Sequence, residues 1–200
     1  MQLVASYHLQ TNEPVVSSAL WQEIQNQIKT AVEAIVWPPG NTVFAINPTK
    51  HGNGVSPIKQ AFLETLVGFG WQTKQVSIFN VGAVDAVFKT ESGIFAVEWE
   101  TGNISSSHRS LNRLSLGLYN KTLVGGILVL PSRSLYNHLT DRIGNLRELQ
   151  PYFPLYQLLP LNHGVLTVIE IEHDKEDPSL PLISKMTDGF ALIAKSKQNS

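Results

Sequence analysis

The sequence of 200 residues contains no cysteine, which excludes a disulfide framework and a thiolate metal site. It has no apolar stretch approaching the roughly 20 residues that a membrane span needs, and its first ten residues lack the basic and apolar regions of a secretory signal. We therefore expect a cytoplasmic protein with no membrane partner. Hydrophobic residues make up 42% and charged residues 16%, a composition typical of globular proteins. Because repeats and linkers are missing too, residues 1–200 are predicted to form one domain.

Several catalytic motifs are also missing. There is no phosphate-binding G-x-x-x-x-G-K-[ST] loop, no zinc-binding H-E-x-x-H and no G-x-S-x-G nucleophile motif. The six histidines show no metal-ligand spacing along the chain, so we expect them to be surface or hydrogen-bonded structural residues. Neither a nucleotide cofactor nor zinc is expected.

Alternating helix and strand patterns predict an α/β fold with a central mixed β-sheet flanked by α-helices. Helices are predicted over residues 17–36, 56–67, 104–118 and 132–140, and strands over residues 42–46, 76–79, 84–88, 94–99, 123–130 and 165–171. Ser56 and Pro57 suit the N-cap and first position of the second helix. The run 123–130 is almost wholly apolar, which indicates a buried central strand. The proline-containing stretch between residues 140 and 165 is predicted to be irregular.

Two neighbouring strands are predicted to form a hairpin that carries three acidic side chains. If the hairpin centres between Glu91 and Ser92, Asp85 lies directly opposite Glu98, with Cβ atoms roughly 5 Å apart, and Glu100 shares their face. Like charges this close raise one another's pKa unless a cation compensates, and Mg²⁺ prefers oxygen ligands. The hairpin therefore predicts a Mg²⁺ site, in which the third carboxylate takes a proton from water or helps to hold a second metal. The alternative is an exposed acidic hairpin without a ligand, and a slip of one residue would separate the side chains.

The distribution of charge is more informative than its sum of −1, which does not by itself indicate a nucleic-acid binder. Residues 85–100 carry four acidic residues against one lysine, whereas residues 102–150 carry six lysines and arginines against two acidic residues. An acidic patch directly before a basic segment is expected of metal-binding carboxylates beside a phosphate-binding surface. Random scatter of charge remains the alternative.

The segment from residue 98 to 117, EWETGNISSSHRSLNRLSLG, closely resembles the segment that follows the catalytic strand in BamHI-like type II restriction endonucleases. Three further blocks resemble that family in the same order and at similar spacing. They are N-G-V-S-P-I-K at residues 53–59, L-T-D-R with E-L and P-Y-F between residues 139 and 153, and P-L-I with T-D-G between residues 181 and 189. The resemblance runs from about residue 36 to residue 190, and the first 30 residues show no clear match.

The resemblance implies the restriction-endonuclease core and a homodimer that hydrolyses both strands of double-stranded DNA at a palindromic site. The expected site is GGATCC, cut after the first G to leave 5′-phosphate ends. Asp85 and Glu98 are implied to be Mg²⁺ ligands, with two ions per active site, and Glu100 stands where most related nucleases carry a lysine. An isologous dimer presents the same reading surface to both half-sites. The helix over 104–118 is expected to contribute to the dimer contact, unless its apolar side simply packs on its own sheet.

The resemblance also implies which residues contact DNA: Lys59, Asn103, Ser105, Arg109, Asp141, Arg142 and Asp188. Asp141 and Arg142 are expected to read the outer G·C pair, because Asp accepts from cytosine N4 and Arg bonds guanine in bidentate fashion. Lys59 is expected to support the site, and the remaining four to read the inner base pairs. Each has a simpler alternative, namely a helix cap, a solvated surface residue or a local ion pair.

The sequence departs from the family at Lys74, where an acidic residue near the metal site is expected, and in the tail that follows Gly189. Lys74 motivates one alternative, a DNA-binding protein of the same fold that has lost cleavage. A second alternative is a nuclease of the same fold with altered specificity, nicking or repair-linked. A two-carboxylate glycosidase is a third, but the additional acid and the basic segment argue against it.

Overall fold

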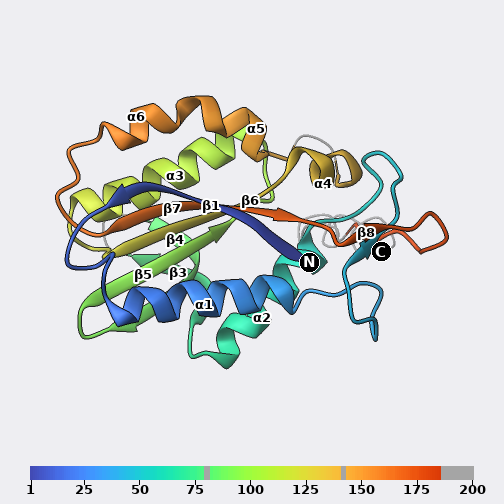
Figure 1. Ribbon diagram of the computed structural model, residues 1–200, viewed down its shortest axis with the longest axis horizontal. Coiled ribbons are helices and arrows are strands. Elements are labelled where there is room, and N and C mark those ends of the chain that lie inside the picture. Colours follow the sequence, from blue (N-terminus) through green and yellow to red (C-terminus); the bar gives the residue numbers. More distant parts are fainter. Residues whose placement is uncertain (79–81, 141–142, 186–200) are drawn as a thin grey trace, which may run out of the picture.

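The computed structural model describes residues 1–78, 82–140 and 143–185, and for residues 74–76 it describes the backbone only. Within these ranges the chain forms three layers, with a six-stranded sheet between two layers of helices (Figure 1). The predicted class, α/β with a central mixed sheet flanked by helices, is confirmed.

The elements follow one another with short connections. The strands are β1 (Gln2–Thr11), β2 (Ala45–Ile46), β3 (Gln72–Ile78), β4 (Gly82–Thr90), β5 (Gly93–Trp99), β6 (Gly125–Pro131), β7 (Val165–Glu172) and β8 (Lys175–Glu176). The helices are α1 (Ala19–Glu33), α2 (Ser56–Gly68), α3 (Ile104–Tyr119), α4 (Arg133–His138), α5 (Leu146–Leu149) and α6 (Phe153–Gln157), with a 3₁₀ turn at Gln150–Tyr152.

The large sheet has the strand order β1-β7-β6-β5-β4-β3, and β2 pairs with β8 in a separate two-stranded sheet. Strand β6 runs parallel to both of its neighbours, β5 and β7, and all of its residues are buried. This confirms the central strand predicted from the apolar run, because a strand covered on both faces carries few polar residues. Helix α3 is the crossover from β5 to the parallel β6, so it begins beside the end of β5.

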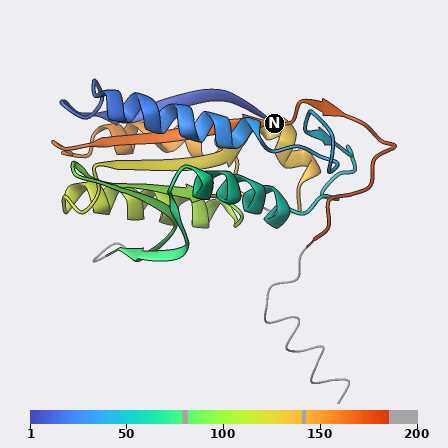
Figure 2. The ribbon, with the colours of Figure 1, turned by 90° about the horizontal axis from the view of Figure 1, so that it is seen from below.

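Two apolar clusters attach the helices to opposite faces of the sheet. One joins α1 and α2 to the sheet and includes Trp21, Ile24, Phe62, Val97 and Trp99. Figure 2 shows α1 and α2 lying across this face. The other joins α3 and α6 to the opposite face and includes Leu111, Leu114, Leu128, Phe153 and Tyr156. Buried residues three or four apart put one stripe of each helix against the sheet.

Each predicted helix and strand is present, with ends that differ by a few residues. The predicted cap of α2 is wrong: Val55 already has helical backbone angles and is the N-cap, so Ser56 is the first helical residue. The stretch predicted to be irregular contains α5 and α6. Strand β1 was not predicted, because its mixed sequence forms a strand by pairing with the distant β7. None of the helices in the described ranges combines the length and apolar character needed to cross a bilayer.

Candidate active site

The acidic hairpin has the predicted register. Ala86 pairs with Val97, and Phe88 with Phe95, so the next position places Asp85 level with Glu98 at the open end of the hairpin. The alternation along β5 then directs Val97 into the cluster under α1 and α2. The register of the hairpin was therefore predicted correctly.

Asp85 is held between a helix and the neighbouring strand. Its Oδ1 lies 2.5 Å from Nζ of Lys59, and its Oδ2 accepts a hydrogen bond of 2.8 Å from the backbone N–H of Trp99. Lys59 is four residues into α2, on the turn that faces the hairpin. Asp85 is therefore held by an ammonium group on one oxygen and by a backbone N–H on the other.

Glu98 is the more buried member of the pair, with 6% of its surface exposed. Its Oε1 lies 2.5 Å from Nη1 of Arg113 on α3, which also donates to the carbonyl oxygen of Ala83. Burial, followed by the charge of Asp85, raises the pKa of Glu98 to about 7, although the nearby Arg113 and Lys59 oppose the shift. The two carboxylates thus favour an additional cation, which is the electrostatic condition for a metal site.

Glu100 is also buried, but its carboxylate is only half satisfied. Its Oε1 accepts a hydrogen bond of 2.5 Å from the backbone N–H of Gly102, whereas its Oε2 is buried without a hydrogen-bond partner. Burial raises the pKa of Glu100, although the Gly102 N–H opposes the shift. The carboxylate oxygens of Asp85, Glu98 and Glu100 do not form a group in which one oxygen from each residue lies within 4.8 Å of the others. The three carboxylates therefore do not converge as closely as the sequence predicted, and Glu100 keeps one oxygen free to accept a proton or a ligand.

The beginning of α3 brings polar side chains to the surface next to Glu100. Asn103 is the N-cap and its Oδ1 accepts from the N–H of Ser106, so the capping role foreseen for it is present. Ser105 and Arg109 are both exposed, and Arg109 donates only to Oγ of Ser106 among its described contacts. A helix N-terminus with an exposed arginine one turn later is a favourable place for phosphate.

Asn53 joins its own segment to two segments that are distant from it in sequence. Its Nδ2 donates to the carbonyl oxygens of Asn47 and His138, and its Oδ1 accepts from the N–H of Ile183. The side chain is fully buried. A side chain at Gly54 would collide with the backbone of Ser184, with a Cβ only 2.1 Å from its carbonyl oxygen. Asn53 and Gly54 therefore hold the segment at His138 close to the segment at Ile183 and Ser184.

Some predicted residues lie outside the described ranges, namely Asp141, Arg142 and Asp188, and so does the side chain of Lys74. Among the described residues, sequence reasoning missed Arg113 and Asn53 as parts of the site. Arg113 had one available signal, since it follows Arg109 by four residues and therefore lies on the same side of α3. No sequence signal indicated the role of Asn53, because its partners His138 and Ile183 are distant in sequence.

Comparison with known proteins gives consistent results. The family model described as restriction endonuclease BamHI matches residues 1–190. The type II restriction enzyme OkrAI of Oceanobacter kriegii is 46% identical over 173 residues, which cover 84% of this chain and 89% of that enzyme. The type II restriction enzyme BamHI of Bacillus amyloliquefaciens is 33% identical over 194 residues, covering 91% of this chain and 89% of that enzyme.

A solved structure supports the fold. The restriction endonuclease BglII, determined in complex with a DNA 16-mer, superposes with a TM-score of 0.59 at 12% identity, over 87% of this chain and 79% of that chain. The fold is thus the restriction-endonuclease core. The family match begins at residue 1, so the expectation that the first 30 residues lie outside the resemblance is wrong. The chain belongs to the BamHI family of type II restriction endonucleases, which are site-specific deoxyribonucleases.

Proposed function

We propose that this enzyme binds double-stranded DNA as a homodimer and, with Mg²⁺, cuts both strands of the palindrome GGATCC after the first G. The observation that carries the catalytic part is the pair Asp85 and Glu98, whose mutual repulsion and burial raise the pKa of Glu98 to about 7. The retained blocks around residues 53–59, 98–117 and 139–153 support the target sequence.

Asp85 and Glu98 are the residues that would hold Mg²⁺, two ions per site. The unsatisfied Oε2 of Glu100 and the charge of the pair both fit such a group. Bound Mg²⁺ neutralises charge on the scissile phosphate and on the departing 3′-oxygen. Lys59 and Arg113 neutralise the two carboxylates when no metal is present, which keeps the site assembled before DNA arrives.

Glu100 is proposed to accept the proton of the attacking water at its free Oε2. Because burial raises the pKa of Glu100, it is a stronger base than an exposed glutamate. Water attacks the phosphorus, the bond from phosphorus to the 3′-oxygen breaks, and the 3′-oxygen takes up a proton. The products are a 5′-phosphate and a 3′-hydroxyl.

Exposed side chains at the start of α3 are proposed to read the inner base pairs, through Asn103, Ser105 and Arg109, together with Asp188. Asp141 and Arg142 are proposed to read the outer pair, and Lys59 to support the site. Each subunit would then contact one half-site.

The homodimer is supported by an exposed apolar surface on α3 and α6. Leu116 and Tyr119 lie near the end of α3, with 46% and 64% of their surface exposed, and Leu155 and Leu158 are 63% and 80% exposed. Large apolar side chains gathered on one surface commonly mark a protein interface. A two-fold axis passing beside α3 would cover them.

The decisive experiment is cleavage of linear DNA that carries one GGATCC site, using the purified protein and Mg²⁺. We expect two fragments with four-base 5′ overhangs, and no cleavage with EDTA or when one base pair of the site is changed. Cutting at another sequence would identify a nuclease of altered specificity. Binding at GGATCC without cutting at any Mg²⁺ concentration would contradict the proposal and favour a DNA-binding protein.

Replacing Arg142 by Ala is expected to weaken discrimination at the outer G·C pair by roughly 1–3 kcal/mol, because a bidentate contact to guanine is lost. The measurement is the ratio of binding constants for GGATCC and for a site with the outer pair changed. Arg147→Ala removes the same charge from an exposed position on α5 and is the matched control. It should change affinity for all sequences equally, if at all. Equal loss of discrimination in both variants would refute the contact.

A further inference from the structure

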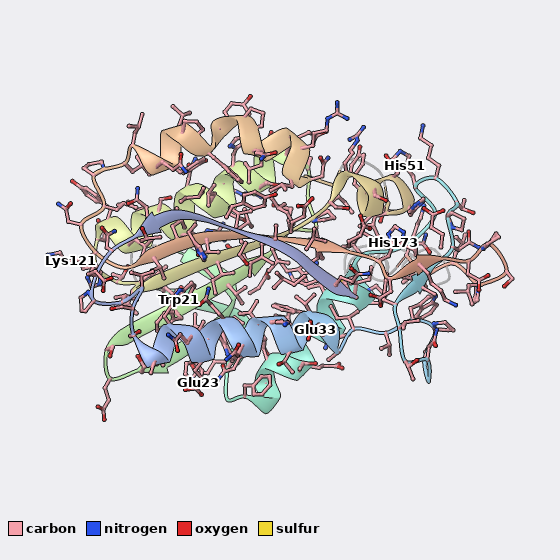
Figure 3. All side chains as sticks on the ribbon, viewed as in Figure 1. Trp21, Glu23, Glu33, His51, Lys121 and His173 are labelled. Carbon is pink, nitrogen blue, oxygen red and sulfur yellow. The ribbon has the colours of Figure 1, made fainter. Side chains whose placement is uncertain are left out.

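Two histidines and a glutamate from different parts of the chain meet beside the small sheet. His138 is the last residue of α4, His173 directly follows β7, and Glu176 ends β8. Figure 3 shows His173 where the chain leaves the large sheet toward β8. One ligand atom from each of the three lies within 4.8 Å of the other two. The residues are up to 38 positions apart, which explains why spacing along the sequence gave no indication of them.

Oxygen atoms lie beside the ring nitrogens of both histidines. Nδ1 of His138 is 3.2 Å from the carbonyl oxygen of Pro48, and Nδ1 of His173 lies against the carboxylate of Glu172. A carbonyl oxygen only accepts, so Nδ1 of His138 is the donor to Pro48, whereas Nδ1 of His173 makes no hydrogen bond. A ring with its only hydrogen at Nδ1 would present a lone pair at Nε2 to a metal ion.

Both Nε2 atoms face the same carboxylate oxygen. Oε1 of Glu176 is 3.0 Å from Nε2 of His138 and 3.7 Å from Nε2 of His173. Nε2 of His138 is within hydrogen-bond distance of this oxygen, so the contact requires a hydrogen on Nε2 when no metal ion is present, and a bound cation would take the place of that hydrogen. Only 8% of the His173 side chain is exposed, so water has little access to take the place of a cation there.

We propose that His138, His173 and Glu176 bind a divalent transition-metal ion of the Zn²⁺ type. Two imidazole nitrogens and one carboxylate oxygen suit Zn²⁺, and the exposed side of Glu176 leaves a fourth position for water. Glu172 orients His173 through Nδ1, and Ser132 donates to the other oxygen of Glu172, which is the outer support typical of metal-bound histidines. The oxygen ligands of Asp85 and Glu98 suit Mg²⁺ instead, so the two sites select different ions.

The metal site would connect α4 to β8 just before the segment proposed to read the outer base pair. The residues after His138 are already bound to Asn53, since Thr140 donates to its carbonyl oxygen at 2.7 Å. A metal at His138 adds a second anchor at the end of α4. The site itself does not depend on the proposed DNA target, because it uses none of the residues assigned to DNA.

The test is a calorimetric titration of metal-free, full-length protein with Zn²⁺ in the presence of a large excess of Mg²⁺. We expect one Zn²⁺ per chain, and at least about tenfold weaker binding by Glu176→Gln, which removes a charged ligand. Glu33→Gln is the matched control, because Glu33 is similarly exposed, 52% against 49%, and lies at the end of α1 (Figure 3). X-ray absorption at the zinc edge should show two imidazole ligands.

Several results would overturn the site. One is the absence of Zn²⁺ binding under these conditions, which would mean that only protons on the histidines compensate the negative charge of Glu176. Another is unchanged affinity in Glu176→Gln, or loss of binding in Glu98→Gln, which would place the ion at the acidic hairpin. Should Glu176→Gln fail to fold, His138→Gln provides the same comparison, with zinc absorption as the readout. Failure of DNA cleavage would leave these results intact, so the two proposals are tested separately.

Discussion

Replacing Glu98 by Gln is expected to reduce DNA cleavage by at least about 10³-fold and to stabilise the metal-free protein at alkaline pH. The loss of cleavage follows because the substitution removes the charge proposed to bind Mg²⁺. The gain in stability follows from the raised pKa of Glu98, about 7 in the folded chain against the ordinary value of 4.5. A buried negative charge beside Asp85 costs free energy, and an uncharged amide of the same shape avoids that cost.

The dependence of this gain on pH has a definite sign. A carboxyl whose pKa is raised on folding contributes stability that is complete below pH 4.5 and is lost as pH rises through about 7. At pH 8 the charged side chain therefore destabilises the native state by up to roughly 3 kcal/mol. Relative to the unsubstituted protein, Glu98→Gln should be more stable at pH 8 by roughly 1–3 kcal/mol, with the difference shrinking toward pH 5.

Denaturant unfolding of the metal-free proteins at pH 8 and pH 5 measures the stability difference, and single-turnover cleavage at saturating Mg²⁺ measures activity. Glu91→Gln is the matched control, because Glu91 lies in the exposed turn of the same hairpin. It should leave both quantities unchanged. Cleavage by Glu98→Gln at near the original rate would show that Glu98 is not a metal ligand. If the variant and the unsubstituted protein were equally stable at pH 8 and at pH 5, the charge of Glu98 would not be buried.

The hairpin that carries Glu98 could be predicted from sequence because its information is local. Alternating side chains on two short strands and a turn between them set the register, and Asp85 and Glu98 follow from it. The central strand β6 was equally accessible, because a parallel strand buried on both faces is a nearly continuous apolar run.

The counterions of the site could not be predicted in this way. Lys59 reaches Asp85 from α2, and Arg113 reaches Glu98 from α3, so both contacts depend on how helices pack on opposite faces of the sheet. The spacing of residues along the chain does not predict such contacts. The same holds for β1, whose pairing partner β7 is more than 150 residues away.

Family resemblance supplied part of what local patterns could not. It placed Lys59 and Arg109 of α3 near the site before any geometry was known. It gave no indication of the cluster of His138, His173 and Glu176, because none of the blocks that carry the resemblance includes all three. Only the fold brings the end of α4 to β8.

Replacing Glu100 by Ala is expected to abolish cleavage, by at least about 10³-fold, while leaving recognition of GGATCC intact. Its carboxylate is buried, one oxygen is held by the Gly102 N–H, and the other has no hydrogen-bond partner. The free oxygen makes no hydrogen bond that stabilises the fold, so we expect its removal to affect cleavage and not folding. Sequence recognition is assigned to other side chains, so it should survive the substitution.

The separation of the two activities is measured by single-turnover cleavage with Mg²⁺ and by fluorescence anisotropy without cleavage, using Ca²⁺ in place of Mg²⁺. Thr101→Ala, at the exposed neighbouring residue, should keep both activities. Because burial raises the pKa of Glu100, the cleavage rate of the unsubstituted enzyme should fall as the pH drops through that raised pKa, where the base becomes protonated. If Glu100→Ala lost discrimination between GGATCC and altered sites together with cleavage, Glu100 would shape the surface that reads DNA. If it still cut at a comparable rate, the proton would have to leave by another route, and the raised pKa of Glu100 would reflect burial alone.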